Sequence, residues 1–364
     1  MIHKPVLVQL VQHLRVGGLE TMALTLAQQL SAQFDVHLVS LEGDEDSLRA
    51  NWSKLELFPK VHGLSKPEGV SVSTISNLRN YLVTHRARYL HSHHLGPLLY
   101  GGAACVGLKV GHLHTHHDGW SLERGNQAKL TRWAVNLFNP VSVADADSVA
   151  EQCQRMGVRV DEVIANGVDL SHFRFGDKLL ARDALALPLD AKILGCVCRL
   201  ESVKAIDHLI QALAELPGNV HLALAGGGSQ RRGLEQMVQQ LGLEQRVHFL
   251  GHIDDPSLVY HALDLFCLVS HNEGAPMSLI EAQACGVRCM VNDVGHCRSL
   301  LHPTQGVLLA NNQPRTIAQG VISAFLEPAK VSVMAQQLRS FAIEVGDGER
   351  MANRYRLYLQ GNAS

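Results

Sequence analysis

The feature that most constrains the fold is an alternation of short apolar segments with longer amphipathic ones. PVLVQLV (5–11) is apolar and rich in β-branched residues, which is typical of a buried parallel strand. Gly17 and Gly18 then precede a segment (19–30) whose apolar residues recur at helical spacing. Because further strand and helix patterns follow in turn, the sequence predicts a parallel sheet covered by helices on both faces.

The same alternation starts afresh in the second half of the chain. KILGCVC (192–198) has the pattern of a buried strand, and strand and helix patterns continue to GVLLA (306–310). A chain of 364 residues is long enough for two such domains. We therefore expect two doubly wound α/β domains with the following bounds: an N-terminal domain over 1–172, a linker over 173–188, a second domain over 189–340, and a C-terminal helix over 341–364 that packs back on the N-terminal domain.

The composition excludes several classes of protein. With 46% hydrophobic and 18% charged residues, the chain has the make-up of a globular protein and differs from a disordered one. The formal net charge of −2 argues against non-specific nucleic-acid binding, which needs a cationic excess. Any bound anion must therefore be held by local donors.

Cysteine usage and hydropathy favour a cytoplasmic location. The eight cysteines are scattered without a repeated Cys-x-x-Cys motif, as small buried thiols in a reducing compartment are. Polar residues interrupt the short apolar run at the N-terminus, so this run does not have the pattern of a signal peptide. No apolar run reaches the roughly 18 residues that a membrane-spanning helix needs, so no span is expected.

Ligands of open α/β sheets bind beyond the carboxyl ends of the strands, so the residues after each predicted strand are site candidates. GGLE (17–20) offers backbone N–H groups to a phosphate or sugar hydroxyl, or is a turn that needs glycine for conformation alone. In RLESVK (199–204), Arg199 and Lys204 either neutralise a diphosphate without metal or form a solvated charge pair. AGGGS (225–229) is either a further donor loop or a plain turn.

SHNEGAPMSLIEAQACG (270–286) places one glutamate on a loop and a second in the helix that follows. Glu273 comes after a buried strand, and Pro276 suits the first turn of the helix that carries Glu281. Free N–H groups at that helix N-terminus favour an anion, so a diphosphate there could have a carboxylate on the sugar at either side. The alternative is an exposed loop acid and a helix-dipole partner, with no ligand.

Histidines are concentrated in two strand-and-loop segments. Alternation along a strand predicts that His112, His114 and His116 share one face. A zinc site usually adds a carboxylate or cysteines at fixed spacing, and only Asp118 is adjacent. We therefore favour a polar cleft lining over a metal site for this set: His91, His93, His94, His112, His114, His116 and His117.

The segment LERGNQAKLTRWAVNLF (122–138) mixes basic and large apolar residues. Its basic residues are Arg124, Lys129 and Arg132, and its large apolar residues are Trp133, Leu137 and Phe138. Such a helix can lie on a membrane surface, but a helix that covers its own domain is the favoured interpretation.

These motifs together resemble the retaining glycosyltransferases of family 4. EGAPMSLIEAQACG resembles the E-G-x-x-x-x-x-x-E-A signature of that family, and GGLE resembles its first glycine-rich loop. ANGVD (165–169) is similar to the segment that closes the family's first domain. RLESVK stands at the family's arginine and lysine, and GHIDD (251–255) resembles the segment beside the nucleotide base. The likeness covers nearly the whole chain in the family's order, and it implies the GT-B architecture of two Rossmann-like domains facing across a cleft.

The resemblance also implies roles for individual residues. The N-terminal domain would bind the acceptor and the second domain the nucleotide-sugar. The catalytic residues implied are Glu273 on the transferred sugar, His117 beside that sugar, and Lys204 and Arg199 on the donor diphosphate. The donor-binding residues implied are Gly17, Gly18, Arg199, Lys204, Gly227, His252, Ile253, Glu273, Ala275, Ser278, Leu279 and, on the ribose, Glu281.

Two positions depart from the family pattern. The family lysine is usually followed by glycine, whereas Ala205 follows Lys204 here. The second residue after the first glutamate is often aromatic, and Ala275 leaves open space there.

The function that the resemblance implies is a retaining transfer of a hexosyl or N-acetylhexosaminyl group from a nucleotide-sugar. A UDP-sugar is favoured and a GDP-sugar is the other choice, with a glycan or lipid-linked acceptor of bacterial cell-surface polysaccharide synthesis. We expect no metal or other cofactor, no nucleic-acid partner, and a cytoplasmic protein that could touch the inner face of the membrane. The alternatives are a nucleotide-sugar epimerase on the same fold and a non-catalytic nucleotide-sugar-binding protein.

Overall fold

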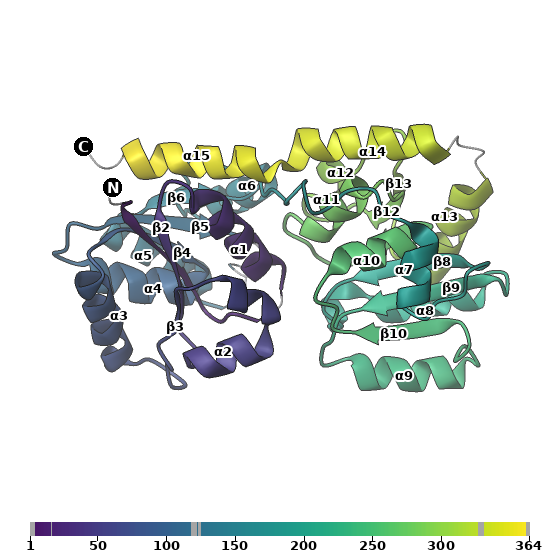
Figure 1. The fold of residues 1–364 in the computed structure, drawn as a ribbon, viewed down its shortest axis with the longest axis horizontal. Coiled ribbons are helices and arrows are strands. Elements are labelled where there is room, and N and C mark those ends of the chain that lie inside the picture. Colours follow the sequence, from purple (N-terminus) through teal and green to yellow (C-terminus); the bar gives the residue numbers. More distant parts are fainter. Residues whose placement is uncertain (1–3, 16, 118–121, 123–124, 327–330, 362–364) are drawn as a thin grey trace. The chain divides into compact units, whose positions relative to one another are not determined.

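The chain forms two units, each built on its own sheet (Figure 1). The structure, a computed structural model, describes residues 4–15, 17–117, 122, 125–326 and 331–361. The N-terminal unit comprises Met1–Gly167 together with Gly348–Ser364, and the C-terminal unit comprises Val168–Asp347.

In the N-terminal unit seven strands form a parallel sheet in the order β3-β2-β1-β4-β5-β6-β7. The strands are β1 Val6–Val11, β2 Asp35–Ser40, β3 Val61–Gly63, β4 Ala87–His93, β5 Gly111–His116, β6 Val141–Ala144 and β7 Glu162–Val163. The helices are α1 Gly18–Leu30, α2 Glu45–Asn51, η1 Ser53–Leu57, α3 Val72–Thr84, α4 Leu95–Cys105, α5 Gln127–Phe138, α6 Asp147–Arg155 and α15 Gly348–Gly361.

In the C-terminal unit six strands form a parallel sheet in the order β10-β9-β8-β11-β12-β13. The strands are β8 Lys192–Val197, β9 Val220–Ala225, β10 Val247–Gly251, β11 Leu265–Leu268, β12 Cys289–Asn292 and β13 Val307–Leu309. The helices are α7 Lys178–Ala184, η3 Ser202–Lys204, α8 Ile206–Ala214, α9 Arg231–Gln240, α10 Pro256–Ala262, α11 Met277–Ala284, α12 Cys297–Leu300, α13 Pro314–Leu326 and α14 Val331–Gly346.

Both sheets confirm the expected doubly wound α/β fold. The first strand of each unit lies inside its sheet, β1 between β2 and β4 and β8 between β9 and β11. The strand order therefore reverses beside β1 and beside β8. In open α/β sheets a ligand crevice forms at such a switch point, beyond the carboxyl ends of the strands.

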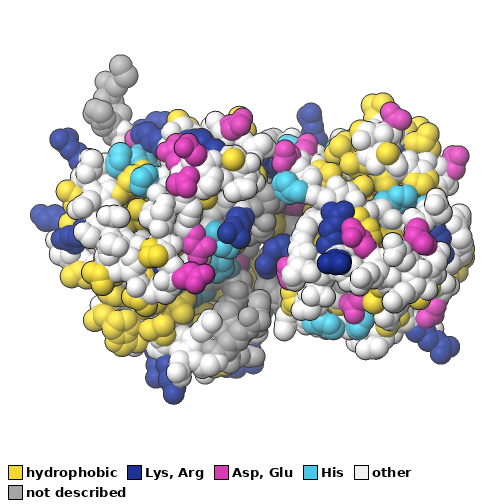
Figure 2. All heavy atoms as spheres, turned by 90° about the horizontal axis from the view of Figure 1, so that it is seen from below, with side chains coloured by type: hydrophobic (Ala, Val, Ile, Leu, Met, Phe, Trp, Pro, Cys, Tyr) yellow, Lys and Arg dark blue, Asp and Glu magenta, His cyan; other side chains and the backbone are white. Residues whose placement is uncertain are grey.

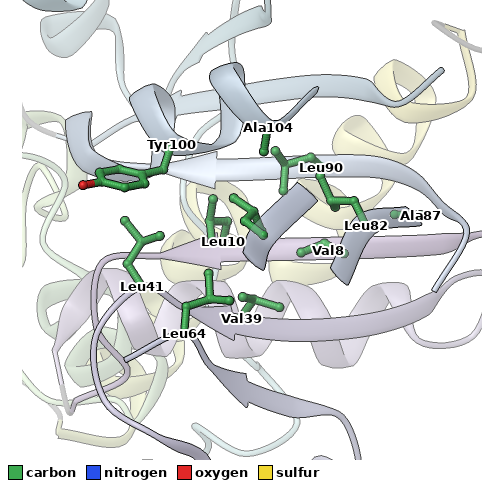
Figure 3. Close-up of a cluster of buried hydrophobic side chains, with 11 residues drawn as sticks. Val8, Leu10, Val39, Leu41, Leu64, Leu82, Ala87, Leu90, Tyr100 and Ala104 are labelled. Atoms are coloured by element: carbon green, nitrogen blue, oxygen red, sulfur yellow. The ribbon is translucent and has the colours of Figure 1, made fainter. Parts of the chain in front are cut away.

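Alternating apolar residues on the strands build the core of the N-terminal unit (Figure 3). Val8 and Leu10 of β1 and Leu90 of β4 are fully buried on one face of the sheet. Helices α3 and α4 cover that face, the latter through Tyr100 and Ala104. This packing fixes the register of β1 and β4, and so fixes where their polar exit residues lie.

The boundaries between the units fall at other positions than the predicted ones. The chain passes into the C-terminal unit at 167–168, so the predicted linker (173–188) lies inside that unit and carries α7. The predicted terminal segment (341–364) is divided at 347–348. Within it, the end of α14 packs on α11 in the C-terminal unit, whereas α15 packs on α1 in the N-terminal unit.

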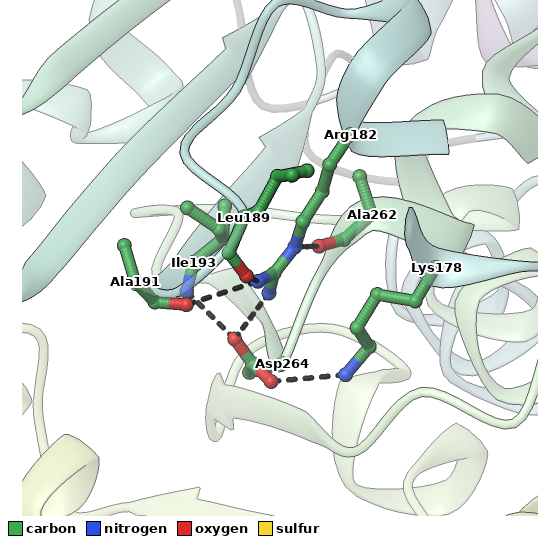
Figure 4. Close-up of polar contacts among 7 residues, drawn as sticks. All are labelled: Lys178, Arg182, Leu189, Ala191, Ile193, Ala262 and Asp264. Carbon is green, nitrogen blue, oxygen red and sulfur yellow. Dashed lines mark hydrogen bonds and ion pairs between the residues drawn. The ribbon is translucent and has the colours of Figure 1, made fainter. Parts of the chain in front are cut away.

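A buried ion pair holds α7 to the sheet of the C-terminal unit (Figure 4). Arg182 is only 3% exposed and donates to Asp264 Oδ2 at 2.7 Å and to the Ala262 carbonyl at 3.0 Å. Asp264 also accepts from the Ile193 N–H at 2.8 Å and from Lys178 at 2.9 Å. Burial raises the pKa of Asp264, but these donors outweigh it and the net pKa is lowered.

The distribution of surface charges and the burial of the cysteines fit the small net charge and the scattered cysteines of the sequence. On the face shown in Figure 2, acidic and basic side chains are interspersed. The eight cysteines form no disulfide and six of them are buried, as expected of small apolar side chains. Within the described part of the chain, no helix combines the length and apolarity needed to cross a bilayer.

Candidate active site

The loops after β8 and β11 bring together the lysine and the first glutamate that the sequence singled out. Lys204 ends the short helix η3, and its Nζ lies 2.6 Å from Oε1 of Glu273. Their side chains are 16% and 8% exposed, so this pair is largely desolvated. Strands β8 and β11 are neighbours in the sheet, which explains why residues 69 positions apart meet.

Burial of the ammonium lowers the pKa of Lys204, but the carboxylate of Glu273 outweighs burial and the net pKa is raised. Lys204 therefore stays charged at neutral pH. The residue that follows, Ala205, is fully buried and adopts the left-handed conformation at φ 49°. This is the position of the family's glycine, so alanine holds the glycine-like path at a conformational cost of about 1–2 kcal/mol.

A second donor, which no sequence motif indicated, fixes Glu273 from the strand side. Ser270 is fully buried and its hydroxyl donates to Glu273 Oε1 at 2.5 Å. The Ser270 carbonyl in turn accepts from the side-chain amide of Asn292 on β12 at 2.8 Å. Glu273 Oε1 thus accepts two hydrogen bonds, and the signal in the sequence was a hydroxyl three residues before the glutamate, at the strand exit.

The loop that carries Glu273 is braced by the turn after β12. Gly295 has φ 53°, and a Cβ at this position would lie 1.9 Å from the Glu273 carbonyl oxygen. The N–H of His296 donates to the Gly274 carbonyl at 3.0 Å. Only glycine fits at 295, so this turn holds the glutamate loop at a fixed distance from the sheet.

The three glycines after β9 differ in what surrounds them. A Cβ at Gly226 would lie 1.9 Å from the Cys198 carbonyl, and a Cβ at Gly228 would lie 2.4 Å from the Leu200 carbonyl. Both glycines therefore allow this turn to pack against the backbone that flanks Arg199. Gly227 has open space where a Cβ would be, and Arg199 is exposed. The predicted donor residues Arg199 and Gly227 thus lie on packed neighbouring loops.

The second glutamate has a different partner from the first. Glu281, on α11, is 5% exposed and accepts from the hydroxyl of Tyr260 at 2.6 Å. Burial and the neighbouring carboxylate raise the pKa of Tyr260 well above its usual value, so the phenol keeps its proton.

The remaining predicted residues of the C-terminal unit follow its strands or begin α11. Ser278 and Leu279 lie in the first turn of α11, with Ser278 half-buried and Leu279 buried. Ala275 is half-buried on the loop before them. After β10, His252 is exposed and Ile253 is half-buried. All of these positions lie at the carboxyl edge of one sheet or just beyond it.

In the N-terminal unit, the glycine pair begins α1 with an acid against it. A Cβ at Gly17 would lie 2.3 Å from Oε2 of Glu20, whereas Gly18 has open space. Glu20 is 4% exposed and lies 3.3 Å from His13. A buried carboxylate in the first turn disfavours a phosphate there and suits a hydroxyl donor.

The histidines divide between the two faces of the N-terminal sheet. His112, His114 and His116 project to one face, where they meet Ser92 and Ser142, as the alternation predicted. On the other face His91 meets Thr115 at 2.7 Å, and Thr115 meets Tyr355 of α15 at 3.0 Å.

The prediction that these histidines line a cleft is wrong for most of them. His91, His93 and His114 are at most 1% exposed and His116 is 6% exposed, so these rings lie in the core, where they contact hydroxyls, the Gln9 amide and, for His93, the ring of His117. Within the described residues, no three histidine, cysteine or acidic side chains are placed to hold a metal ion.

His117 leaves the end of β5 and both of its ring nitrogens are engaged inside the N-terminal unit. Nε2 lies 2.9 Å from Nδ1 of His93, and Nδ1 lies 3.2 Å from Oδ2 of Asp145. Asn166, in the ANGVD segment, donates to the same oxygen of Asp145 at 2.8 Å. Asp118, the carboxylate next to His117 in the sequence, lies outside the described residues.

Sequence comparison matches both halves of the chain to glycosyltransferase families. The sequence model for glycosyl transferases group 1 matches residues 177–341, and that for glycosyltransferase family 4 matches residues 16–172. The D-inositol 3-phosphate glycosyltransferase of Mycobacterium ulcerans is 40% identical over 144 residues, and that of Mycobacterium marinum is equally similar. The match to the first spans 38% of this chain and 31% of the relative, so the chain covers about a third of the length of such relatives.

Solved structures match over nearly the whole chain at low identity. HepE of Anabaena in complex with UDP-glucose has a TM-score of 0.85 and 22% identity, covering 98% of this chain and 99% of its own. Sucrose-phosphate synthase of Thermosynechococcus elongatus has a TM-score of 0.84 and 19% identity, covering 99% of this chain and 100% of its own. These likenesses show a shared fold.

Proposed function

Because this chain belongs to the group 1 glycosyltransferases and has the GT-B fold, we propose that it transfers a sugar from a nucleotide-sugar to a glycan or lipid-linked acceptor. The observation that carries the proposal is the buried pair of Lys204 and Glu273 at the switch point of the C-terminal sheet. A UDP-sugar is the favoured donor, in line with the UDP-glucose complex of HepE, and a GDP-sugar is the alternative. The acceptor proposed is one of bacterial cell-surface polysaccharide synthesis.

In this proposal the donor diphosphate binds between Lys204, Arg199 and the N–H groups around Ser278 and Leu279 at the start of α11. Departure of the nucleoside diphosphate concentrates negative charge on its phosphates, and preorganised cations and N–H groups stabilise that charge without a metal. Glu273 accepts hydrogen bonds from the transferred sugar, and Ser270 and Lys204 hold the carboxylate in place for this.

Glu281 accepts from the ribose, and Tyr260 orients its carboxylate. His252 and Ile253 line the nucleotide base, Ala275 lies beside the sugar, and Gly227 lets the backbone approach the donor. The open backbone at Gly18, with Gly17 before it, offers donors to a hydroxyl of the donor or acceptor. In the proposal His117, a residue of the N-terminal unit, lies beside the donor sugar.

We further propose retention of the anomeric configuration through front-face attack. A covalent route needs a carboxylate free to attack the anomeric carbon. Oε1 of Glu273 already accepts from Lys204 and Ser270, and in this proposal the carboxylate accepts hydrogen bonds from the sugar and does not attack the anomeric carbon.

The proposal includes peripheral contact of the protein with the inner face of the membrane through helix α5. Its buried residues are small, whereas Trp133 and Leu137 are 52% and 57% exposed beside Lys129 and Arg132. Aromatic and apolar side chains flanked by cations suit an anionic lipid surface.

The double change Trp133→Ala with Leu137→Ala should reduce co-sedimentation with anionic vesicles several-fold. The control is Leu57→Ala, which changes an exposed leucine elsewhere in this unit and should leave co-sedimentation unchanged. Equal sedimentation of both variants would contradict membrane contact.

The transfer reaction is tested with a panel of UDP-, GDP- and ADP-sugars in the presence of EDTA. We expect one nucleotide class to raise the melting temperature, because a ligand bound by the native state alone stabilises it. The same donor should be consumed only when a glycan or lipid-linked acceptor is added, and NMR of the product should show the donor's anomeric configuration. Epimerisation of the donor without acceptor, binding without turnover, or loss of activity in EDTA would each contradict the proposal.

A further inference from the structure

Five side chains in the N-terminal unit form one hydrogen-bonded chain through the ring of His117. From one end, Gln9 Oε1 lies 2.8 Å from His93 Nε2, and His93 Nδ1 lies 2.9 Å from His117 Nε2. His117 Nδ1 lies 3.2 Å from Asp145 Oδ2, which also accepts from Asn166. Gln9 and His93 are fully buried, Asp145 is 2% exposed and Asn166 is 6% exposed. These side chains therefore depend mainly on one another for their hydrogen bonds.

The chain permits only certain positions for its protons. The carboxylate of Asp145 only accepts, so His117 Nδ1 must carry a hydrogen. Burial lowers the pKa of His93 well below its usual range, so this ring is neutral and carries a hydrogen on one nitrogen alone. Two properties then remain open: which nitrogen of His93 carries this hydrogen, and whether the ring of His117 is charged.

Two complete patterns satisfy these conditions, and they differ by one proton. In the first, His117 is an imidazolium that donates to both Asp145 and His93, and His93 Nε2–H donates to Gln9 Oε1. In the second, His117 is neutral and accepts from His93 Nδ1–H, so His93 Nε2 is bare and needs a donor. The Gln9 amide supplies that donor if it turns so that its NH₂ faces the ring.

The surroundings of Gln9 allow that rotation. Its amide nitrogen has no hydrogen-bond partner among the described residues although it is fully buried. Turning the amide therefore breaks no hydrogen bond except the one to His93, which the exchanged amide end re-forms. A buried amide with one unused end is otherwise unfavourable.

We propose that Gln9, His93 and Asp145 are positioning residues of His117, and that they couple uptake of one proton by its ring to a tautomer change at His93 and rotation of the Gln9 amide. The proton comes from solvent and is returned to it, and no other atom is exchanged. Asn166 holds Asp145 in place, which gives a physical role to the asparagine of ANGVD. The link to sugar transfer rests on the proposed function, in which His117 lies beside the donor sugar.

Other titratable groups also face the two rings and enter the equilibrium. They are Asp145 after β6, His91 on β4, His94 at the start of α4, and His114 and His116 on β5, with Tyr355 of α15 beyond His91. Burial lowers the pKa of His91, His114 and His116 and raises that of Tyr355, so these four groups stay uncharged near neutral pH. Asp145 is therefore the one group of this set that favours the charged form of His117.

The test is ¹⁵N NMR of histidine-labelled protein between about pH 5 and 9, with signals assigned through His93→Gln and His117→Gln. In the wild type, His93 should change from Nε2–H at low pH to Nδ1–H at high pH, in the same transition as His117. Asp145→Asn keeps the shape but removes the counter-charge, so the transition should move down by about one pH unit or more. The ionised side chain of Gln9→Glu can only accept a hydrogen bond, so this variant should move the transition to higher pH. Ser92→Ala, a buried change on the opposite face of β4, is the matched control and should leave the His93 transition in place.

A His93 tautomer that stays constant while His117 titrates, or a transition that Asp145→Asn leaves in place, would overturn the relay. Activity gives a separate answer about the proposed function. If His117 acts on the donor sugar, Asp145→Asn should lower kcat about tenfold or more with little change in KM for the donor. The coupled NMR transition with an unchanged kcat would keep the relay and overturn the role of His117 in transfer.

Discussion

Replacing Lys204 with alanine is expected to lower kcat for sugar transfer by about 10²–10³, the usual loss when one oriented donor to a developing anion is removed. The ammonium of Lys204 is held 2.6 Å from Glu273 and is largely desolvated, so it is preorganised before the donor arrives. Its attraction to the phosphates is strongest when the leaving group gains charge, so the loss should fall mainly on kcat.

The matched control is Lys192→Ala, which removes an exposed lysine from the start of β8, the strand that precedes the loop of Lys204, and should leave kcat unchanged. Lys204→Arg should recover part of the activity only if the left-handed turn at Ala205 accommodates the larger guanidinium. A kcat within a factor of about three of wild type for Lys204→Ala in folded protein would remove this residue from the catalytic site.

Replacing Asp264 with alanine is expected to lower the free energy of unfolding of the C-terminal unit by about 3–5 kcal/mol. Asp264 is the only carboxylate within ion-pair distance of the buried Arg182 among the described residues, and it also accepts from the Ile193 N–H. The substitution leaves a guanidinium charge in the interior of the unit without compensation. Chemical denaturation followed by circular dichroism measures the loss.

Lys178→Ala serves as the control for this effect. Lys178 contacts the same carboxylate, but its side chain is 44% exposed, so its removal should change stability by about 1 kcal/mol or less. Because the pKa of Asp264 is lowered in the folded state, its contribution is present above the unfolded pKa near 3.8 and is lost as pH falls through the folded value. Equal stability of Asp264→Ala and Lys178→Ala would contradict the buried-pair account.

The sequence predicted those features that depend on local pattern. Apolar segments of β-branched residues marked the strands of both sheets, and the rule that ligands bind beyond strand ends selected the loops of Lys204 and Glu273. These two residues meet because β8 and β11 are neighbours, an order that the doubly wound fold implies. Alternation along β5 likewise placed three histidines on one face.

Features that depend on which side chains meet across the fold were not predictable in this way. No sequence motif singles out a role for Ser270 or Gly295, and their roles appear only with the contacts to Glu273. The segment 173–188 was predicted as a linker because the alternation of strands and helices starts afresh after it, whereas Arg182 within it is buried against an aspartate 82 positions away. The histidines read as cleft residues because their partners, Gln9 among them, lie on other strands.

The proposed mechanism requires that Arg199 and Lys204 hold the donor diphosphate without a metal. Calorimetric titration in EDTA tests it most directly, using the nucleoside diphosphate that the donor panel selects and its monophosphate. We expect the wild type to bind the diphosphate roughly tenfold or more tightly than the monophosphate. The double variant Arg199→Ala with Lys204→Ala should lose this preference while it still binds the nucleoside. A double variant that retains the wild-type preference would contradict the account.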